Sequence, residues 1–277
     1  MFGLNKIIPS NSNISFMNYR KIFISISASA IVVCLFLLFF KGLNLGIDFK
    51  GGTLIEISTK NTNIGELRSI LSPEFNDVSL QEFGDSETII IRLQNESNIE
   101  SIKTIDKVKD LISDKVAEFR RSEFVGPTIS SELLWTGLQA IAFALIAILI
   151  YIWLRFEWQF GFGAVVALTH DVIFTLGILC LFSIDFSLSS IAAILTIAGY
   201  SINDSVVIFD RIRENLRKYK KLDLYELINS SINQTLSRTV LTSLTTLIAL
   251  FSLYFLGGEV IKGFTLAMII GVFVGTY

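Results

Sequence analysis

Long runs of apolar residues constrain this chain more than any other feature. Six such runs lie at about 22–43, 132–153, 160–182, 188–209, 239–256 and 263–277. A hydrocarbon core about 30 Å thick is crossed by a helix of about 20 apolar residues. Of the 277 residues, 52% are hydrophobic and 17% are charged, whereas about 25% are charged in a soluble domain. The sequence therefore predicts a multi-pass α-helical membrane protein with six transmembrane helices.

The last apolar run is the shortest of the six. It begins at Gly263 and stops with the chain at Tyr277, which corresponds to roughly 22 Å of helix. We expect from this length that the natural protein continues and that the sixth span is truncated here. Small residues recur at every fourth position in this run, a pattern typical of close helix–helix packing: Gly263, Ala267, Gly271 and Gly275.

Basic residues predict the orientation of the chain. They precede the first span within residues 1–21 and gather again at 211–221. Because cytoplasmic flanks are enriched in Lys and Arg, both segments are predicted to be cytoplasmic, and we interpret the second as a topology determinant. Within 210–237, apolar residues recur at helical spacing, which predicts an amphipathic helix along the membrane surface. The five spans after the external region fall within 132–277.

The polar region 44–131 lies on the opposite, periplasmic side in this topology and has the pattern of a small α+β domain. Strands are predicted at 53–58, 77–83, 88–93 and 123–125, and helices at 64–71 and 99–119. Their order, β-α-β-β-α-β, is that of the split βαβ, or ferredoxin-like, type. No nucleophile stands beside a base in this region. We therefore expect the domain to bind or to move, and the chain not to be an enzyme.

Several classes of site are disfavoured by the residue types. Cys34 and Cys180 stand alone in apolar runs, without the CxxC spacing of a metal or disulfide site. His170 is the single histidine, which excludes a multi-histidine metal cluster. The net charge is −2 and the basic residues flank spans, so nucleic acid is not an expected partner. We expect neither a metal nor an organic cofactor.

Polar side chains inside the predicted spans point to a function. Asn203 and Asp204 lie within the apolar run 188–209. An acidic side chain near the middle of a bilayer costs about 2.5–3.5 kcal/mol on insertion scales. Asp204 therefore needs a partner, water or a proton of its own. We expect it to take up and release a proton, and to drive another process by doing so.

The candidate partners of Asp204 form two sets, one in the third span and one in the fifth: His170 with Asp171, and Arg238 with Thr242 and Thr245. A nearby arginine keeps a carboxylate ionised, whereas a dry environment favours the protonated form. Movement of Arg238 would therefore switch the proton affinity of Asp204. The structural alternative is a static buried ion pair between these two side chains.

A glycine-rich turn follows the first span, with Gly46, Asp48, Gly51 and Gly52 in close succession. One interpretation is a hinge that transmits motion between the membrane and the external domain. The other is a rigid glycine turn in which Asp48 hydrogen-bonds within its own loop.

Four segments, in this order, resemble the SecF family of bacterial protein-export subunits. They are Gly46-Ile-Asp-Phe-Lys-Gly-Gly52, Val125-Gly-Pro127, the segment from Ala198 to Asn215, and Leu236-Ser-Arg-Thr-Val-Leu-Thr242. The resemblance runs from about Leu43 to Tyr277 and includes the layout of one span, an external domain and five further spans.

The resemblance implies half of a resistance–nodulation–division type of transporter in the bacterial inner membrane. It implies pairing with SecD into a pseudo-symmetric unit that works beside the SecYEG channel and uses the proton gradient to promote translocation of unfolded polypeptide. Protons would be the coupling ion, and lipids the surrounding partners. It further implies that the proton path is lined by Asn203, Asp204, Arg238 and Thr242, and His170-Asp171 matches a pair common in SecF.

Two other functions compete with this one. A small-molecule or lipid exporter of the same superfamily would also use proton antiport, but such exporters usually carry large external domains in one long chain. A structural scaffold of the translocon would not transport protons. In a scaffold, Arg238→Ala would harm assembly without removing any dependence on the proton gradient.

Overall fold

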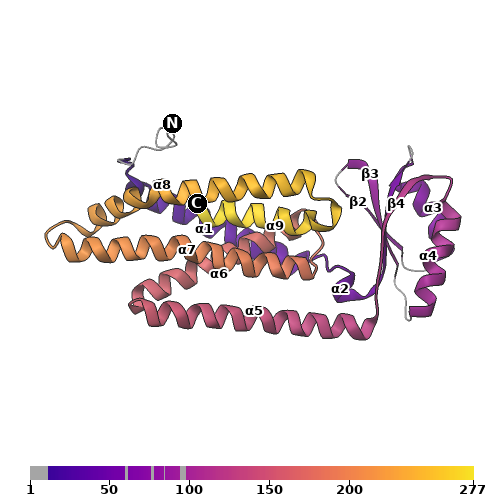
Figure 1. The fold of residues 1–277 in the computed structure, drawn as a ribbon, viewed down its shortest axis with the longest axis horizontal. Helices are drawn as coiled ribbons and strands as arrows, with labels where there is room; N and C mark the ends of the chain where they lie inside the picture. Colours follow the sequence, from indigo (N-terminus) through magenta and orange to yellow (C-terminus); the bar gives the residue numbers. More distant parts are fainter. Residues whose placement is uncertain (1–11, 60–61, 76–77, 84, 94–97) are drawn as a thin grey trace. The chain divides into compact units, whose positions relative to one another are not determined.

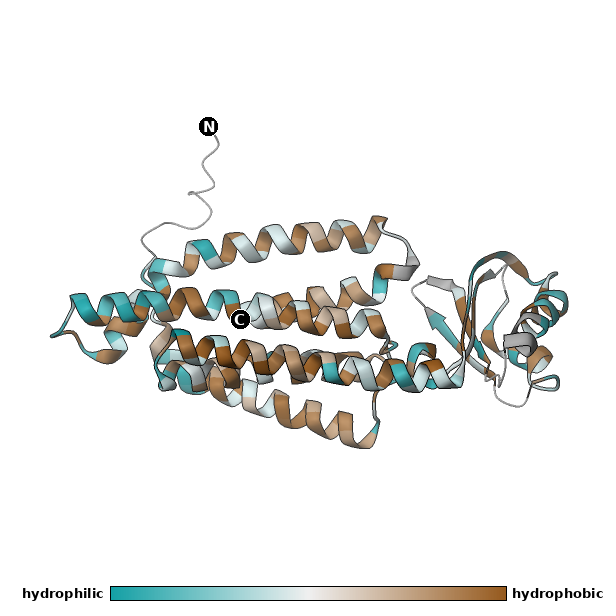
Figure 2. Ribbon diagram, turned by 60° about the horizontal axis from the view of Figure 1, so that its bottom comes forward, coloured by the Kyte–Doolittle hydropathy of each residue, from teal (hydrophilic) through white to brown (hydrophobic). Residues whose placement is uncertain are grey.

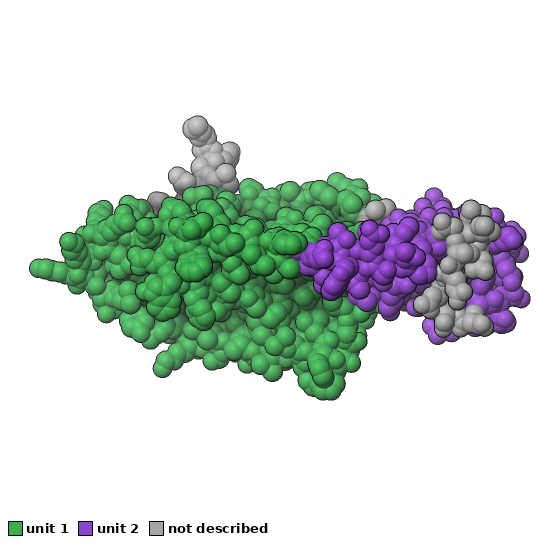
Figure 3. Space-filling view, turned by 90° about the horizontal axis from the view of Figure 1, so that it is seen from below, with its two compact units in different colours: residues 1–44, 140–277 green, residues 45–139 purple. Residues whose placement is uncertain are grey.

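The structure is a computed structural model that describes residues 12–59, 62–75, 78–83, 85–93 and 98–277. The chain forms two compact units, one of residues 1–44 with 140–277 and one of residues 45–139 (Figure 3). The second unit contains most of the predicted external region 44–131 and the first part of the helix that follows it.

The first unit is a bundle of helices (Figure 1). Its helices are α1 (Phe16–Phe40), α5 (Pro127–Arg155, of which residues 140–155 belong here), α6 (Trp158–Leu181), α7 (Leu188–Lys218), α8 (Leu224–Leu256) and α9 (Glu259–Thr276). All of them except α9 are long and apolar enough to cross a membrane, and α9 holds a shorter apolar helix, Ile261–Thr276. Hydrophilic residues gather where α7 passes into α8, beyond the apolar lengths of both helices (Figure 2).

Close helix contacts in this bundle depend on small residues. A Cβ added at Gly271 of α9 would clash with the Ile197 side chain of α7, and one added at Gly177 of α6 would clash with Cys34 of α1. Ala267 is fully buried, whereas a Cβ at Gly263 would meet no atom within 4 Å. The predicted stripe on α9 therefore packs through three of its four positions (Ala267, Gly271 and Gly275), with Gly275 lying beside α6 and α7.

Helix α1 is tied to the bundle at both of its ends. At its start, Ile14 N donates to Asn233 Oδ1 of α8 at 2.9 Å, and Asn233 Nδ2 donates back to Ile14 O at 2.8 Å. Just after its end, Asn44 Nδ2 donates to Asp185 Oδ1 at 2.6 Å. These polar contacts hold the start of α1 against α8 and the segment after its end against the connection between α6 and α7.

The second unit is a four-stranded antiparallel sheet covered on one face by two helices (Figure 1). Its elements are α2 (Ile47–Lys50), β1 (Gly52–Thr59), α3 (Ile64–Leu71), β2 (Val78–Phe83), β3 (Asp85–Leu93), α4 (Asn98–Ile112) and β4 (Val116–Val125). The strand order across the sheet is β2-β3-β1-β4. Alternate strand residues such as Ile55, Ile57, Ile89 and Ile91 pack with Leu67 and Leu71 of α3 in one core.

The predicted helix over 99–119 is too long. Helix α4 ends at Ile112, and β4 begins at Val116. The predicted last strand, 123–125, is the end of this ten-residue strand. Residues 116–119 have apolar positions that also fit a helical spacing, but pairing with β1 satisfies their backbone groups along the sheet edge. Pairing with β1 therefore makes residues 116–119 a strand in spite of their helical spacing.

The helical segment predicted within 210–237 is present, but as parts of two longer helices. Helix α7 continues to Lys218, and α8 begins at Leu224, where the Asp223 side chain accepts from Tyr225 N at 3.0 Å. Helix α8 then runs without interruption to Leu256. The polarity of the side chains changes along both helices, but backbone hydrogen bonding does not depend on that polarity. A hydropathy boundary is therefore not a helix boundary in this chain.

Candidate functional site

Asp204 lies on α7 in the interior of the first unit. Its side chain is buried, with 6% relative exposure. Within the described residues, Asp204 Oδ2 has no hydrogen-bond partner. An ionised carboxylate is costly to bury when one of its oxygens has no partner, so Asp204 is a costly group at this position unless water, a cation or a proton reaches it.

Arg238 lies near the middle of α8 and is exposed on the surface of this unit. It lies on α8, which packs against α7, the helix of Asp204. Across the part of the chain that the structure describes, however, no nitrogen of Arg238 lies within 4 Å of an Asp204 oxygen. The two residues thus lie on adjoining helices and do not form an ion pair in this conformation.

The remaining predicted residues of this group flank the same pair. Asn203 and Thr245 are exposed, and Thr242 is half-buried. Thr242 Oγ1 donates to Thr239 O at 2.8 Å, and Thr245 Oγ1 donates to Leu241 O at 2.9 Å. Both hydroxyls therefore give their hydrogen to their own helix, as is common for threonine in helices, and keep an oxygen that can accept.

The other predicted set, His170 and Asp171 on α6, is joined to α7 by Ser201, a residue that the sequence analysis did not single out. Asp171 is buried on α6, and its Oδ2 accepts a 2.5 Å hydrogen bond from Ser201 Oγ of α7. Its Oδ1 lies 2.8 Å from His170 Nδ1. A Cβ at Gly275 would lie 3.2 Å from Asp171 Oδ2, so the glycine leaves room for this cluster.

Ser201 also relates the two carboxylates to each other. It precedes Asp204 by three positions on α7, so the two side chains lie one turn apart on the same buried face. Asp171 therefore contacts the turn of α7 that adjoins Asp204. Ser201 belongs to the motif Ala198 to Asn215, but its residue type did not mark it as a site residue.

A row of hydroxyls joins three helices near this site. Tyr200 Oη donates to Ser243 Oγ at 3.0 Å, and Ser243 Oγ lies 2.8 Å from Thr276 Oγ1. Thr239 Oγ1, one position after Arg238, is a second buried atom without a partner in the described residues. The sequence prediction missed these residues, because the sequence of one helix does not show which residues of another helix its hydroxyls contact.

The glycine turn lies in the second unit and is packed. Gly51 and Gly52 have φ angles of +75° and +107°, which other residues rarely adopt. A Cβ at Gly51 would lie 3.0 Å from Ser130 Oγ and 3.3 Å from Val125 O. Gly46 precedes α2, and Asp48 lies in its first turn. The geometry is that of a tight turn held against the start of α5.

Among the described residues, no group of three or more His, Cys, Asp or Glu side chains is placed so that it could hold a metal ion. The chemistry that this arrangement offers is proton exchange at buried carboxylates, with hydroxyls and a nearby guanidinium to modulate it.

Two family models match this chain. Residues 104–277 match the C-terminal region of the protein export membrane proteins SecD and SecF, and residues 36–62 match the SecD/SecF GG motif. Protein translocase subunit SecF of Rickettsia rickettsii is 42% identical over 277 residues, covering 98% of this chain and 90% of the relative. The SecF subunit of Calditerrivibrio nitroreducens is 44% identical, covering 98% of this chain and 92% of the relative.

Solved structures agree with these sequence matches. SecDF from Thermus thermophilus, a translocon-associated membrane protein, matches with a TM-score of 0.88 at 37% identity, over 97% of this chain. SecDF in its super-membrane-facing form matches with a TM-score of 0.70 at 36% identity, over 96% of this chain. This chain spans 37% of the length of each SecDF chain. It belongs to the SecF family of protein translocase subunits.

Proposed function

We propose that this chain is an accessory subunit of the bacterial Sec translocase and that it uses proton passage at Asp204 to promote protein translocation. The observation that carries this proposal is the buried Asp204 carboxylate, whose Oδ2 has no partner in the described residues. A carboxylate in this setting is stable when it holds a proton or when a cation reaches it. It can therefore exist in two states, and the position of Arg238 selects between them.

The partner proposed for this unit is SecD. Asn203 and Arg238 are exposed on membrane-capable helices of this chain. Such side chains in membrane proteins face a bundle interior or a water-filled cavity, not lipid. A second helical half that covers this face would enclose the site. SecDF chains, of which this chain matches 37%, are long enough to hold such a half.

The proton path proposed here consists of Asn203, Asp204, Arg238 and Thr242, supported by His170, Asp171 and Thr245. The oxygens of Thr242 and Thr245 can accept hydrogen bonds from water that reaches Asp204. Ser201 donates to Asp171 and can accept from water on the Asp204 side. Ser201 thereby links the supporting Asp171 to water beside Asp204, and Asp204 is the group that changes its protonation state.

The proposed topology places the N-terminus and the connection between α7 and α8 in the cytoplasm, and residues 44–131 in the periplasm, at the plasma membrane. Helix α9 is proposed as the sixth span. The sheet order β2-β3-β1-β4 supports assignment of the second unit to the split βαβ type. This unit would bind the emerging polypeptide beside the SecYEG channel, and protons would be the coupling ion without any other cofactor.

Proton flux in vesicles tests the proposal. Vesicles that contain the SecYEG channel are prepared with this chain alone, with its SecD-type partner alone, and with both. We expect proton flux only when both are present, together with translocation that depends on the gradient. Translocation without proton flux would identify a scaffold, and proton flux coupled to a small solute would identify an exporter.

A further inference from the structure

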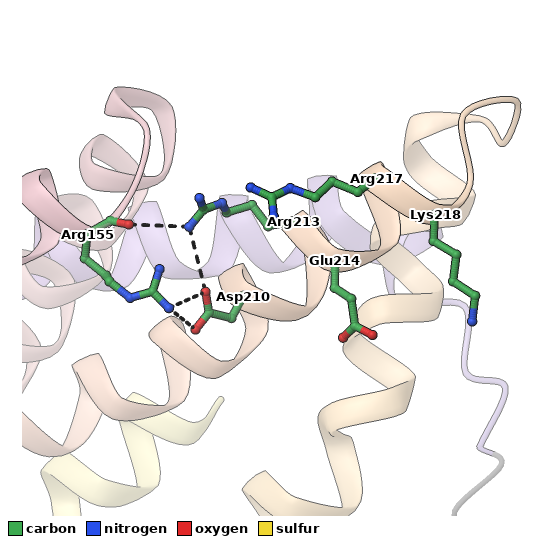
Figure 4. Close-up of a pocket in the computed structure, with 6 residues that line it drawn as sticks. All are labelled: Arg155, Asp210, Arg213, Glu214, Arg217 and Lys218. Atoms are coloured by element: carbon green, nitrogen blue, oxygen red, sulfur yellow. Dashed lines mark hydrogen bonds and ion pairs between the residues drawn. The ribbon is translucent and has the colours of Figure 1, made fainter.

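We propose that a basic cavity formed by the ends of α5 and α7 binds the phosphate headgroup of an anionic phospholipid. The cavity has a volume of about 500 Å³. Its lining consists almost wholly of charged side chains (Figure 4): Arg155, Asp210, Arg213, Glu214, Arg217 and Lys218. The proposal concerns none of the residues of the proposed proton path.

One side of the cavity is held in place by an ion pair between helices. Arg155 Nη2 donates to both oxygens of Asp210, at 3.1 and 2.9 Å. Arg213 Nη1 donates to Arg155 O at 3.4 Å and lies 4.0 Å from Asp210 Oδ1. The guanidinium groups of Arg155 and Arg213 also lie 5.0 and 6.0 Å from the Phe156 ring, which is buried against Phe160 and Phe209. These contacts fix the positions of two cations.

The charges in the cavity do not balance. Asp210 is shared by Arg155 and Arg213, and Glu214 accepts from Arg211 at 2.5 Å. Arg217 has no ion pair or hydrogen bond with any residue that the structure describes. Four cations and two carboxylates line the cavity, which leaves an excess of positive charge.

Arg213 and Arg217 supply the geometry of an anion site. They are four positions apart on α7, and Figure 4 shows their guanidinium groups extending to the same side of the helix. Like charges at this spacing destabilise a helix slightly, and an anion between them reverses that effect. Guanidinium groups bind phosphate oxygens through paired hydrogen bonds. A phosphate is therefore the ligand class that this pair fits.

The surroundings of Arg155 favour a lipid as the source of that phosphate. Trp153 and Trp158 flank it and are 73% and 69% exposed. Exposed tryptophans at the ends of apolar helices mark the level of the lipid headgroups, and basic clusters just outside a span attract anionic lipids. A topology determinant requires basic charge alone, whereas these residues form a cavity with a fixed wall.

The chain offers a matched control. Lys220 is exposed and belongs to the same basic run, but it does not line the cavity. Arg217→Gln and Lys220→Gln each remove one positive charge close to the same membrane surface. Because Arg217 makes no ion pair or hydrogen bond with the described residues, we expect its replacement to leave the fold intact.

The test measures bound phosphatidylglycerol on the complex of this chain with its SecD-type partner, by native mass spectrometry after release from nanodiscs. We expect Arg217→Gln to weaken binding about tenfold, through loss of a charge-assisted hydrogen bond to the phosphate, and Lys220→Gln to leave it nearly unchanged. Equal loss in both variants, or loss in neither, would overturn the site. Displacement of the lipid by millimolar inorganic phosphate would overturn the assignment to a lipid, because a soluble anion would then fill the cavity.

Discussion

Ser201 of α7 donates a 2.5 Å hydrogen bond to Asp171 of α6, and both side chains are almost fully buried. Asp171 uses both of its carboxylate oxygens, one with Ser201 and one with His170. Asp204, one turn along α7, has an oxygen with no partner in the described part of the chain. Two acids in adjoining but different environments are suited to different roles. Asp171 anchors two helices, and Asp204 is the group that we propose changes its protonation state.

Replacement of Ser201 tests the first of these roles. Ser201→Ala leaves Asp171 Oδ2 without its donor, so we expect the free energy of unfolding to fall by about 1–3 kcal/mol. Thermal unfolding of the purified chain in detergent measures this loss. Thr196→Ala is the control, because Thr196 is exposed and its hydroxyl bonds, among the described residues, within its own helix to Ala192 O. Equal effects of the two substitutions would show that the Ser201 bond is not a significant anchor.

Arg238 separates a proton-coupling role from a structural one. It is exposed and forms no ion pair with Asp204 in the described residues, so Arg238→Ala should change the stability of the isolated chain by less than about 0.5 kcal/mol. Export that depends on the proton gradient should nevertheless be lost. Removal of one member of a static buried pair costs about 3–5 kcal/mol, and a loss of that size in the isolated chain would contradict the proposed role.

Helix α9 provides a test of packing within one sequence stripe. Gly271→Ala places a methyl group against Ile197, and we expect a loss of about 1–3 kcal/mol from overpacking. Gly263→Ala meets open space and should stabilise the helix by up to about 1 kcal/mol. Unfolding of the two variants under the same conditions compares them directly. A neutral Gly271→Ala would mean that α7 and α9 do not pack as closely as the structure has them.

The glycine turn is tested by two residues with similar φ angles. Gly51 and Gly42 have φ of +75° and +72°, but only Gly51 has close neighbours for a Cβ. Alanine at either position should cost about 1–3 kcal/mol for the backbone conformation. Gly51→Ala should cost more, because Ser130 and Val125 must also move. If Gly51→Ala were the milder change in a thermal-unfolding comparison, the turn would be a loose hinge and not a packed one.

The elements of this fold were largely predictable from the sequence where hydropathy or alternation is strong. The apolar runs correspond to α1 and α5–α9, and the β-α-β-β-α-β order is present in the second unit. Helix ends were less predictable, since α7 continues beyond its apolar part to Lys218. Residues 116–119, the start of β4, form a strand because they pair with β1, and no local sequence pattern predicts that pairing.

The candidate site was proposed from the sequence for a different reason. Asp204 and Arg238 are conspicuous because charges are rare in apolar runs. That they lie on adjoining helices without forming an ion pair is a matter of tertiary structure. Ser201, Tyr200 and Ser243 were missed, because hydroxyls are frequent in such helices and usually bond to their own backbone. Their bonds between helices follow from packing alone.

The most direct test of the central claim uses Asp204→Asn in vesicles that contain the SecYEG channel, this chain and its SecD-type partner. Proton uptake is followed with a trapped pH-sensitive dye after a gradient is imposed, and translocation is measured in parallel. We predict that the variant assembles and unfolds like the unmodified protein but shows no proton flux above that of empty vesicles, and that the gradient no longer stimulates translocation. Undiminished proton flux with undiminished translocation would contradict the role of Asp204.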